Sequence, residues 1–213
     1  MKRYPKLFKE IAKNINDAEK ENIGLIKRTN CFVLYNINHL RDSLQNLYSN
    51  KNSEDIESGE IKYYFKESII AATFITNDIL DGKNINEVNY IGAKKGWGVL
   101  LYDILITIST LEKDGLIPSR GSVSGSAQKV WKKYFTDRDD IKKEELKSKS
   151  HNVDYLDCIY TINKNSFVDY KILENSHIKF MNELEEKDMD YLSIMYSVDS
   201  NLVKYIYAKY RDL

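Results

Sequence analysis

Residues 90–103 read Tyr90-Ile91-Gly92-Ala93-Lys94-Lys95-Gly96-Trp97-Gly98-Val99-Leu100-Leu101-Tyr102-Asp103. Three glycines fall within seven residues, between a predicted strand that ends at Ile91 and a predicted helix that begins at Val99. Because glycine has no Cβ atom, such a turn lets main-chain N–H groups approach an anion, and the positive end of the helix dipole lies at the same point. The stretch therefore predicts a strand–turn–helix unit that can hold a phosphate group. A tight surface turn is the competing interpretation.

The chain after this junction alternates between helical and strand-like patterns. The apolar residues of 99–111 share one helical face, and Asp114-Gly115 is typical of the end of a helix. A two-residue strand at 116–117 precedes Pro118, and Ser124 is placed to cap a helix over 126–135. The charge run at 136–150 predicts a solvated surface segment, 157–162 predicts a strand, and 170–213 predicts two helices.

The chain before the junction predicts further helices and strands. An amphipathic helix is expected over 4–21, a strand over 31–35, and a helix capped by Asn38 that carries Leu40, Leu44 and Leu47. Residues 48–60 are polar and predict a loop. The β-branched and aromatic residues of 61–65 and 68–76 predict an antiparallel hairpin, and 77–86 predicts a turn region that holds Asp81-Gly82.

Composition indicates a soluble globular chain of 213 residues, with 42% hydrophobic and 30% charged residues. The 32 basic and 32 acidic residues cancel, so the overall positive charge typical of nucleic-acid binding is absent, although a local basic patch stays open. No secretory h-region or apolar span is visible, and we expect a cytoplasmic location without membrane contact. The two cysteines, Cys31 and Cys158, lie in apolar runs and predict buried free thiols. With three scattered histidines they form no zinc pattern, so no metal is expected.

The glycine turn and the following helix resemble the GNAT (N-acetyltransferase) superfamily. Its signature is Arg or Gln, two residues, Gly, one residue, and Gly or Ala, followed by a helix that opens with paired leucines. Gly96, Gly98 and Leu100-Leu101 match that signature. The family's next helix commonly carries Asn, two residues, Ala, and a Tyr four residues later; here Ser124, Ala127 and Trp131 take those places. The resemblance covers about residues 60–135.

The resemblance implies acyl transfer from acetyl-CoA, or a related acyl-CoA, to a small or macromolecular amine. The donor would be bound by a set of residues around the turn: Lys94, Lys95, Gly96, Trp97, Gly98, Val99 and Ser124. The amine would attack the thioester directly. Two departures are visible, because Ala93 replaces the family's Arg or Gln, and Trp131 replaces a Tyr whose proton an indole cannot supply. Tyr134 is then the candidate general acid, and Glu67, acting through water, the candidate base.

No domain linker is visible, so we expect one α/β (α+β) domain over 1–213, with a mostly antiparallel, partly V-split central sheet. A helix over 1–22 and a helical extension over 166–213 would flank a GNAT-like core at 23–165. Two other functions stay open: a non-catalytic GNAT-like accessory protein of a phage or mobile element, and a GNAT-like modifier of nucleic-acid bases. Either would act in the host-cell cytoplasm if the chain is phage-encoded.

The remaining polar and aromatic candidates have simpler explanations as structural residues. His39, His151 and His177 are expected at the surface, and Asp103 is expected to face solvent or a partner charge. The tyrosines of the last helix, Tyr205, Tyr207 and Tyr210, predict packing against the body of the protein. An aromatic platform for single-stranded nucleic acid is the alternative, although the dense set of basic residues that accompanies such a platform is missing.

Overall fold

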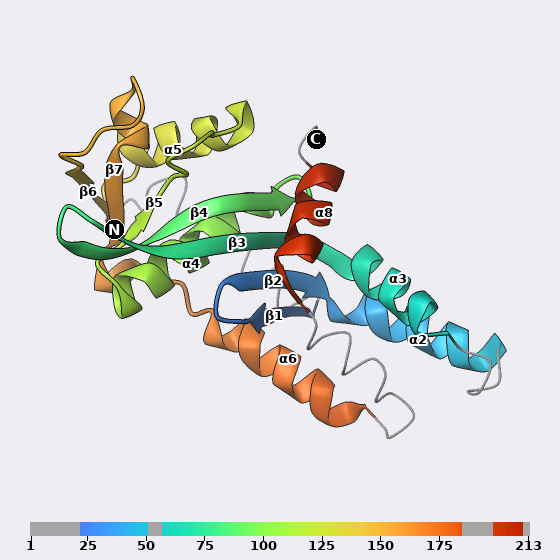
Figure 1. Cartoon of the computed structure of the whole chain (residues 1–213). Helices are drawn as coiled ribbons and strands as arrows, with labels where there is room; N and C mark the ends of the chain where they lie inside the picture. Colours follow the sequence, from blue (N-terminus) through green and yellow to red (C-terminus); the bar gives the residue numbers. More distant parts are fainter. Residues whose placement is uncertain (1–21, 51–56, 185–197, 211–213) are drawn as a thin grey trace.

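The computed structural model describes residues 22–50, 57–184 and 198–210 (Figure 1). Its centre is one sheet with the strand order β1-β2-β3-β4-β5-β7-β6, antiparallel except for the parallel pair β4 and β5. The strands are β1 (Ile23–Lys27), β2 (Cys31–Asn36), β3 (Ile69–Leu80), β4 (Lys83–Ala93), β5 (Leu116–Ile117), β6 (Ile141–Glu145) and β7 (Cys158–Ile162). Helices flank the sheet: α2 (Ile37–Asn50), α3 (Ser58–Ser68), α4 (Gly98–Glu112), α5 (Gly125–Asp137), α6 (Lys171–Glu183) and α8 (Ser200–Tyr210). The predicted mixed fold with a mostly antiparallel sheet is confirmed.

The two faces of the sheet carry separate hydrophobic clusters. Successive side chains of a strand point to opposite faces. Phe32 and Leu34 of β2 accordingly pack in a cluster with α4 and α5, whereas Val33 and Tyr35 pack with α2, α3 and α8. Helix α4 lies against the sheet (Figure 1), and all of residues 100–109 are buried. Because α4 is enclosed on all sides, nearly every position along it is apolar.

The sheet opens between its two parallel strands. β4 and β5 pair only at Asn86 with Leu116 and at Glu87 with Ile117, whereas β4 continues to Ala93. Pro118 follows β5 directly and has no N–H group with which to extend the pairing. The carboxyl ends of the two strands therefore separate, and the chain passes from β4 into α4 on the open side.

The long hairpin of β3 and β4 turns at Asp81-Gly82, as predicted. Both residues have positive φ, 51° and 79°, which is typical of a type I′ turn. Pairing reaches Leu80 and Lys83 on either side, so most of the predicted turn region 77–86 is strand.

The hairpin predicted over 61–65 and 68–76 is wrong in its first half, because residues 58–68 form helix α3. Ile61 and Phe65 are spaced as on one helical face, and both are buried. A capping box between Glu57 and Glu60 starts the helix, and this pattern was visible in the sequence. The loop predicted over 48–60 is wrong at both ends, since α2 continues to Asn50 and α3 begins at Ser58.

Helix α2 is capped by a different residue from the one predicted. The side chain of Asn36, and not that of Asn38, accepts a hydrogen bond of 2.8 Å from the His39 amide. The predicted helix over 4–21 lies outside the described residues, whereas both helices predicted after residue 170 are confirmed by α6 and α8.

The segment predicted as solvated, 136–150, is wrong in part. Residues 141–145 form β6, and Arg138 is 1% exposed. Its guanidinium lies 3.0 Å from the buried Asp103 carboxylate and 2.6 Å from Asp140. Asp103 therefore faces a partner charge, which is one of the two environments expected for it from the sequence. Both cysteines are buried free thiols, as predicted. Among the described helices, none has the length and apolar character needed to cross a bilayer.

Candidate functional site

A cavity of about 220 Å³ lies at the glycine turn, on the side where the sheet opens. Four parts of the chain meet there: the end of β4 with its turn, the start of α4, the start of α5, and α8. The lining residues are Ile91, Gly92, Ala93, Lys94, Lys95, Gly96, Gly98, Val99, Tyr102, Ser124, Ser126, Ala127, Val130, Tyr207 and Tyr210. Six of the seven predicted donor-binding residues are thus brought together. Trp97 is the exception and packs against the hydrophobic cluster around α4.

The turn presents main-chain N–H groups to this cavity. Gly96 has a φ of +91°, in the left-handed region that glycine adopts without strain. The Lys94 amide donates to the Ile70 carbonyl at 2.8 Å, which anchors the turn to β3. Within the described part of the chain, the amides of Gly98 and Val99 at the first turn of α4 have no protein acceptor. Such amides, with the helix dipole behind them, can bind an anion.

A second helix start faces the same cavity. Ser124 is the N-cap of α5, as predicted, and its Oγ accepts a hydrogen bond from the Ala127 amide at 3.4 Å. Ser126, in the first turn, lies 3.2 Å from Ser124 between their Oγ atoms. The positive ends of α4 and α5 therefore converge on one cavity.

Cationic side chains add to that polarity. Lys94 lines the cavity and is half-buried, whereas Lys95 is exposed at its edge. Burial lowers the pKa of the Lys94 ammonium, and the neighbouring charge of Lys209 lowers it further. The Glu67 carboxylate opposes these effects only in part, so an anion bound beside Lys94 would relieve them further.

A narrower crevice of about 30 Å³ adjoins the cavity and lies along the gap between β4 and β5. It contains Val88 and Asn89 of β4, Ser119 and Ser122 from the loop after β5, and Trp131 of α5. Five residues line both spaces: Ile91, Tyr102, Ser124, Ala127 and Tyr207. The two spaces are therefore neighbours along the opening of the sheet.

Tyr134, the predicted general acid, lies in the core and not on either space. It is 0% exposed, and its hydroxyl donates to the Val99 carbonyl at 3.3 Å. Its ring packs edge-on against Tyr102 and Trp131. Burial and the charge of Asp103 hold the pKa of Tyr134 well above its ordinary value. These contacts favour a structural role, and its catalytic role stays a prediction.

Glu67, the predicted base, lies in the last turn of α3, beside α8. Its carboxylate lies 2.8 Å from the Lys209 ammonium, and it lines neither the cavity nor the crevice. The pair ties α8 to α3. Its role as a base stays a prediction.

Helix α8 was not expected to form part of the site. At Gly92, an added Cβ atom would lie 2.6 Å from Tyr207 Cα and 2.7 Å from the Ile206 carbonyl oxygen. The Tyr210 hydroxyl donates to the Ile69 carbonyl at 3.0 Å. Figure 1 shows α8 (red) across the ends of β3 and β4. The sequence signal for this contact was Gly92, whose missing side chain admits the helix main chain.

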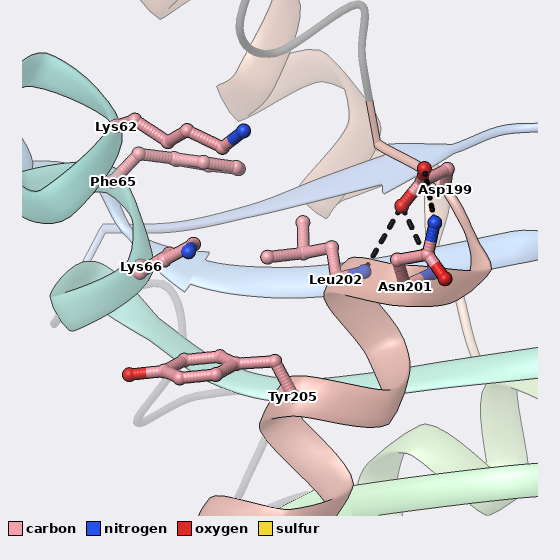
Figure 2. A pocket seen from close by; sticks show the side chains of 7 residues that line it. All are labelled: Lys62, Phe65, Lys66, Asp199, Asn201, Leu202 and Tyr205. Carbon is pink, nitrogen blue, oxygen red and sulfur yellow. Dashed lines mark hydrogen bonds between the residues drawn. The ribbon is translucent and has the colours of Figure 1, made fainter. Parts of the chain in front are cut away.

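A separate hollow of about 280 Å³ lies between α3 and α8 (Figure 2). Lys62 and Lys66 line it from α3, and Asp199 faces them from the start of α8. Asp199 accepts hydrogen bonds of 2.9 Å from the amides of Asn201 and Leu202. Because this helix start is already capped by a carboxylate, it offers an anion less than the start of α4 does, which has no side-chain cap.

The histidines do not gather at the cavity. His151 Nε2 lies 2.8 Å from the Ser119 carbonyl oxygen, and His177 Nδ1 lies 2.8 Å from the Tyr35 hydroxyl. His39 is exposed on α2. Over residues 22–50, 57–184 and 198–210, no three His, Cys, Asp or Glu side chains come together in a way that could hold a metal ion.

Comparison with known proteins gave no match: no family model, no curated protein and no solved structure matches the chain.

Proposed function

We propose that the protein binds an acyl-CoA thioester in the cavity at the glycine turn and transfers the acyl group to an amine. The observation that carries the proposal is the convergence of two helix starts and Lys94 on a cavity where the parallel strands separate. A pyrophosphate suits this polarity, since N–H groups and an ammonium supply hydrogen bonds and charge together.

The cavity and the crevice would hold different parts of the ligand. The amides of Gly98 and Val99, with Lys94, would hold the pyrophosphate of the donor. The crevice between β4 and β5 would then take the thioester end, because it continues the cavity along the opening of the sheet. The amine would attack the carbonyl carbon there, held in position by the narrow walls of the crevice.

A second candidate function is binding of the acyl-CoA at the same site without transfer of the acyl group. Trp131 is 1% exposed, and the Tyr134 hydroxyl is already bonded within the core, so α5 brings no free phenol to the crevice. This observation favours a binding module that uses CoA as a ligand, and a rate measurement separates it from the enzyme.

The test of the proposal is stabilisation by CoA. A ligand at a hundred times its dissociation constant adds about 2.7 kcal/mol to the free energy of unfolding, which thermal unfolding with and without CoA measures. Ser126→Glu puts a carboxylate at the start of α5, where it suits the helix dipole but repels a pyrophosphate. We expect this variant to fold normally and to bind CoA about tenfold or more weakly.

Ser126→Gln is the matched control, because it has nearly the same size and no charge. It should bind CoA within about threefold of the natural protein, a difference of less than 1 kcal/mol. If CoA gives no stabilisation, or if the Glu and Gln variants bind it equally, the proposed site is wrong.

A further inference from the structure

Two tyrosines stand at the junction between the cavity and the crevice. Tyr102 of α4 and Tyr207 of α8 line both spaces. They are the titratable side chains among the residues that the two spaces share, since the third polar one, Ser124, is engaged in capping α5. The Tyr207 phenol lies close enough to Tyr102 to raise the pKa of Tyr102, although burial is the larger cause.

These two hydroxyls differ from those of neighbouring buried tyrosines. Tyr134, Tyr160 and Tyr210 each donate to a main-chain carbonyl. No hydrogen bond within residues 22–50, 57–184 and 198–210 occupies the hydroxyl of Tyr102 or Tyr207, and neither oxygen is among the fully enclosed atoms that lack a partner. Tyr102 is only 3% exposed, so its hydroxyl meets the cavity rather than bulk solvent. A hydroxyl that lines a cavity and has no protein partner can bond to a ligand or to water there.

The position of Tyr207 is fixed by the fold. Its Cα lies directly over Gly92 of β4, and its ring packs edge-on against Tyr90 with centroids 5.8 Å apart. Because Gly92 lacks a side chain, the main chain of α8 comes close enough to place a phenol at the opening of the sheet. The Lys209–Glu67 ion pair and the Tyr210 hydrogen bond hold the helix there.

The geometry points to Tyr207 as the proton donor to the leaving thiolate, with the Tyr102 hydroxyl donating a hydrogen bond to the thioester carbonyl oxygen. This inference rests on the proposed function.

The step balances without another reactant. The nucleophile nitrogen attacks the thioester carbonyl carbon, a C–N bond forms, and the C–S bond breaks with its electron pair on sulfur. The phenolic proton of Tyr207 passes to that sulfur and gives the free thiol, while the proton lost by the nitrogen passes to water. Water then reprotonates the phenolate. Phenols and alkyl thiols ionise in a similar range, which makes this transfer efficient.

The test compares binding with chemistry in the full chain. CoA affinity is measured calorimetrically, and release of free thiol from acetyl-CoA is followed with the protein in excess, with water as the nucleophile and then with n-butylamine. We expect Tyr207→Phe to slow thiol release by about a hundredfold or more and to leave CoA affinity within about twofold. Tyr205→Phe, on the same helix but at the other hollow, is the control and should release thiol at the natural rate.

Each outcome decides between the two proposals. If CoA does not bind, the proposed function and this inference both fail. If CoA binds and Tyr207→Phe releases thiol at the natural rate, or if the natural protein releases none above the buffer rate, this inference fails and the binding site stands. Circular dichroism and the unfolding temperature of Tyr207→Phe confirm that the variant is folded.

Discussion

The hydroxyl of Tyr35 lies 2.8 Å from Nδ1 of His177 and joins strand β2 to helix α6. Tyr35 is fully buried, and the two rings pack edge-on with centroids 5.9 Å apart. Burial lowers the pKa of His177 from 6.5 to about 4, and the nearby charge of Arg28 contributes. His177 is therefore half-buried, and less exposed than expected from the sequence, since its ring forms part of the contact between the sheet and α6.

The first prediction is a loss of stability in acid that depends on His177. Between pH 6.5 and about 4, the unfolded imidazole binds a proton that the native ring does not, so the free energy of unfolding falls as pH falls through this range. The full effect is about 3 kcal/mol. Urea unfolding at pH 7 and pH 4.5 measures it. His177→Gln should lose this part of the pH dependence, whereas His39→Gln, at an exposed position, should keep it; equal slopes in both variants would contradict the assignment.

The second prediction concerns the buried pair of Arg138 and Asp103. Burial raises the pKa of Asp103 to about 6, and the Arg138 guanidinium opposes that rise. Arg138→Met leaves a buried carboxylate without its cation, and we expect a loss of about 3–5 kcal/mol in the free energy of unfolding. Adding Asp103→Asn should restore a large part of it. Lys149→Met, which breaks an exposed pair with Glu145, should leave the unfolding temperature unchanged.

The third prediction concerns the contact between β4 and α8. Gly92→Ala places a Cβ atom within 2.6 Å of main-chain atoms that cannot yield, so α8 must move. We expect a loss of about 1–3 kcal/mol, or roughly 2–4 °C in the unfolding temperature per kcal/mol. Gly59→Ala, in open space on α3, should be neutral or stabilising by up to about 1 kcal/mol. Similar losses in both variants would mean that the close approach has no special cost.

The fourth prediction tests the role of Tyr134. Tyr134→Phe removes the hydrogen bond to the Val99 carbonyl and should cost about 1 kcal/mol in the free energy of unfolding. Because the hydroxyl does not line the cavity or the crevice, thiol release from acetyl-CoA should stay at the natural rate. A loss of rate without a loss of stability would restore Tyr134 as the general acid.

The parts of the fold that local signals determine could be predicted from the sequence. The glycine turn, helix α4, the short strand β5 and the Ser124 cap of α5 all depend on residues close together in the chain. Helix α3 was missed because Ile61, Tyr63, Tyr64 and Phe65 have high strand propensity. Burial of one face of α3 against α2 and the sheet outweighs that propensity.

The contacts that complete the candidate site could not be read from local patterns. Arg138 belongs to a charge run that looks solvated, and its buried partner Asp103 lies on another helix. The same holds for Tyr207, whose spacing in α8 fits simple packing and does not indicate that it reaches Gly92 and the crevice. Such pairings are set by the tertiary arrangement, which a single sequence does not specify.

Helix α8 and the glycine turn meet at the cavity although they are far apart in the chain. A ligand that touches both would bridge segments with no local connection, and its binding energy would hold α8 against the sheet. The amide hydrogens of α8 would then exchange more slowly with solvent when the ligand is bound, while those of α2, which does not line the cavity, would change less. Ligand binding at the cavity could therefore be detected from the hydrogen exchange of α8, a helix that is not part of the glycine turn.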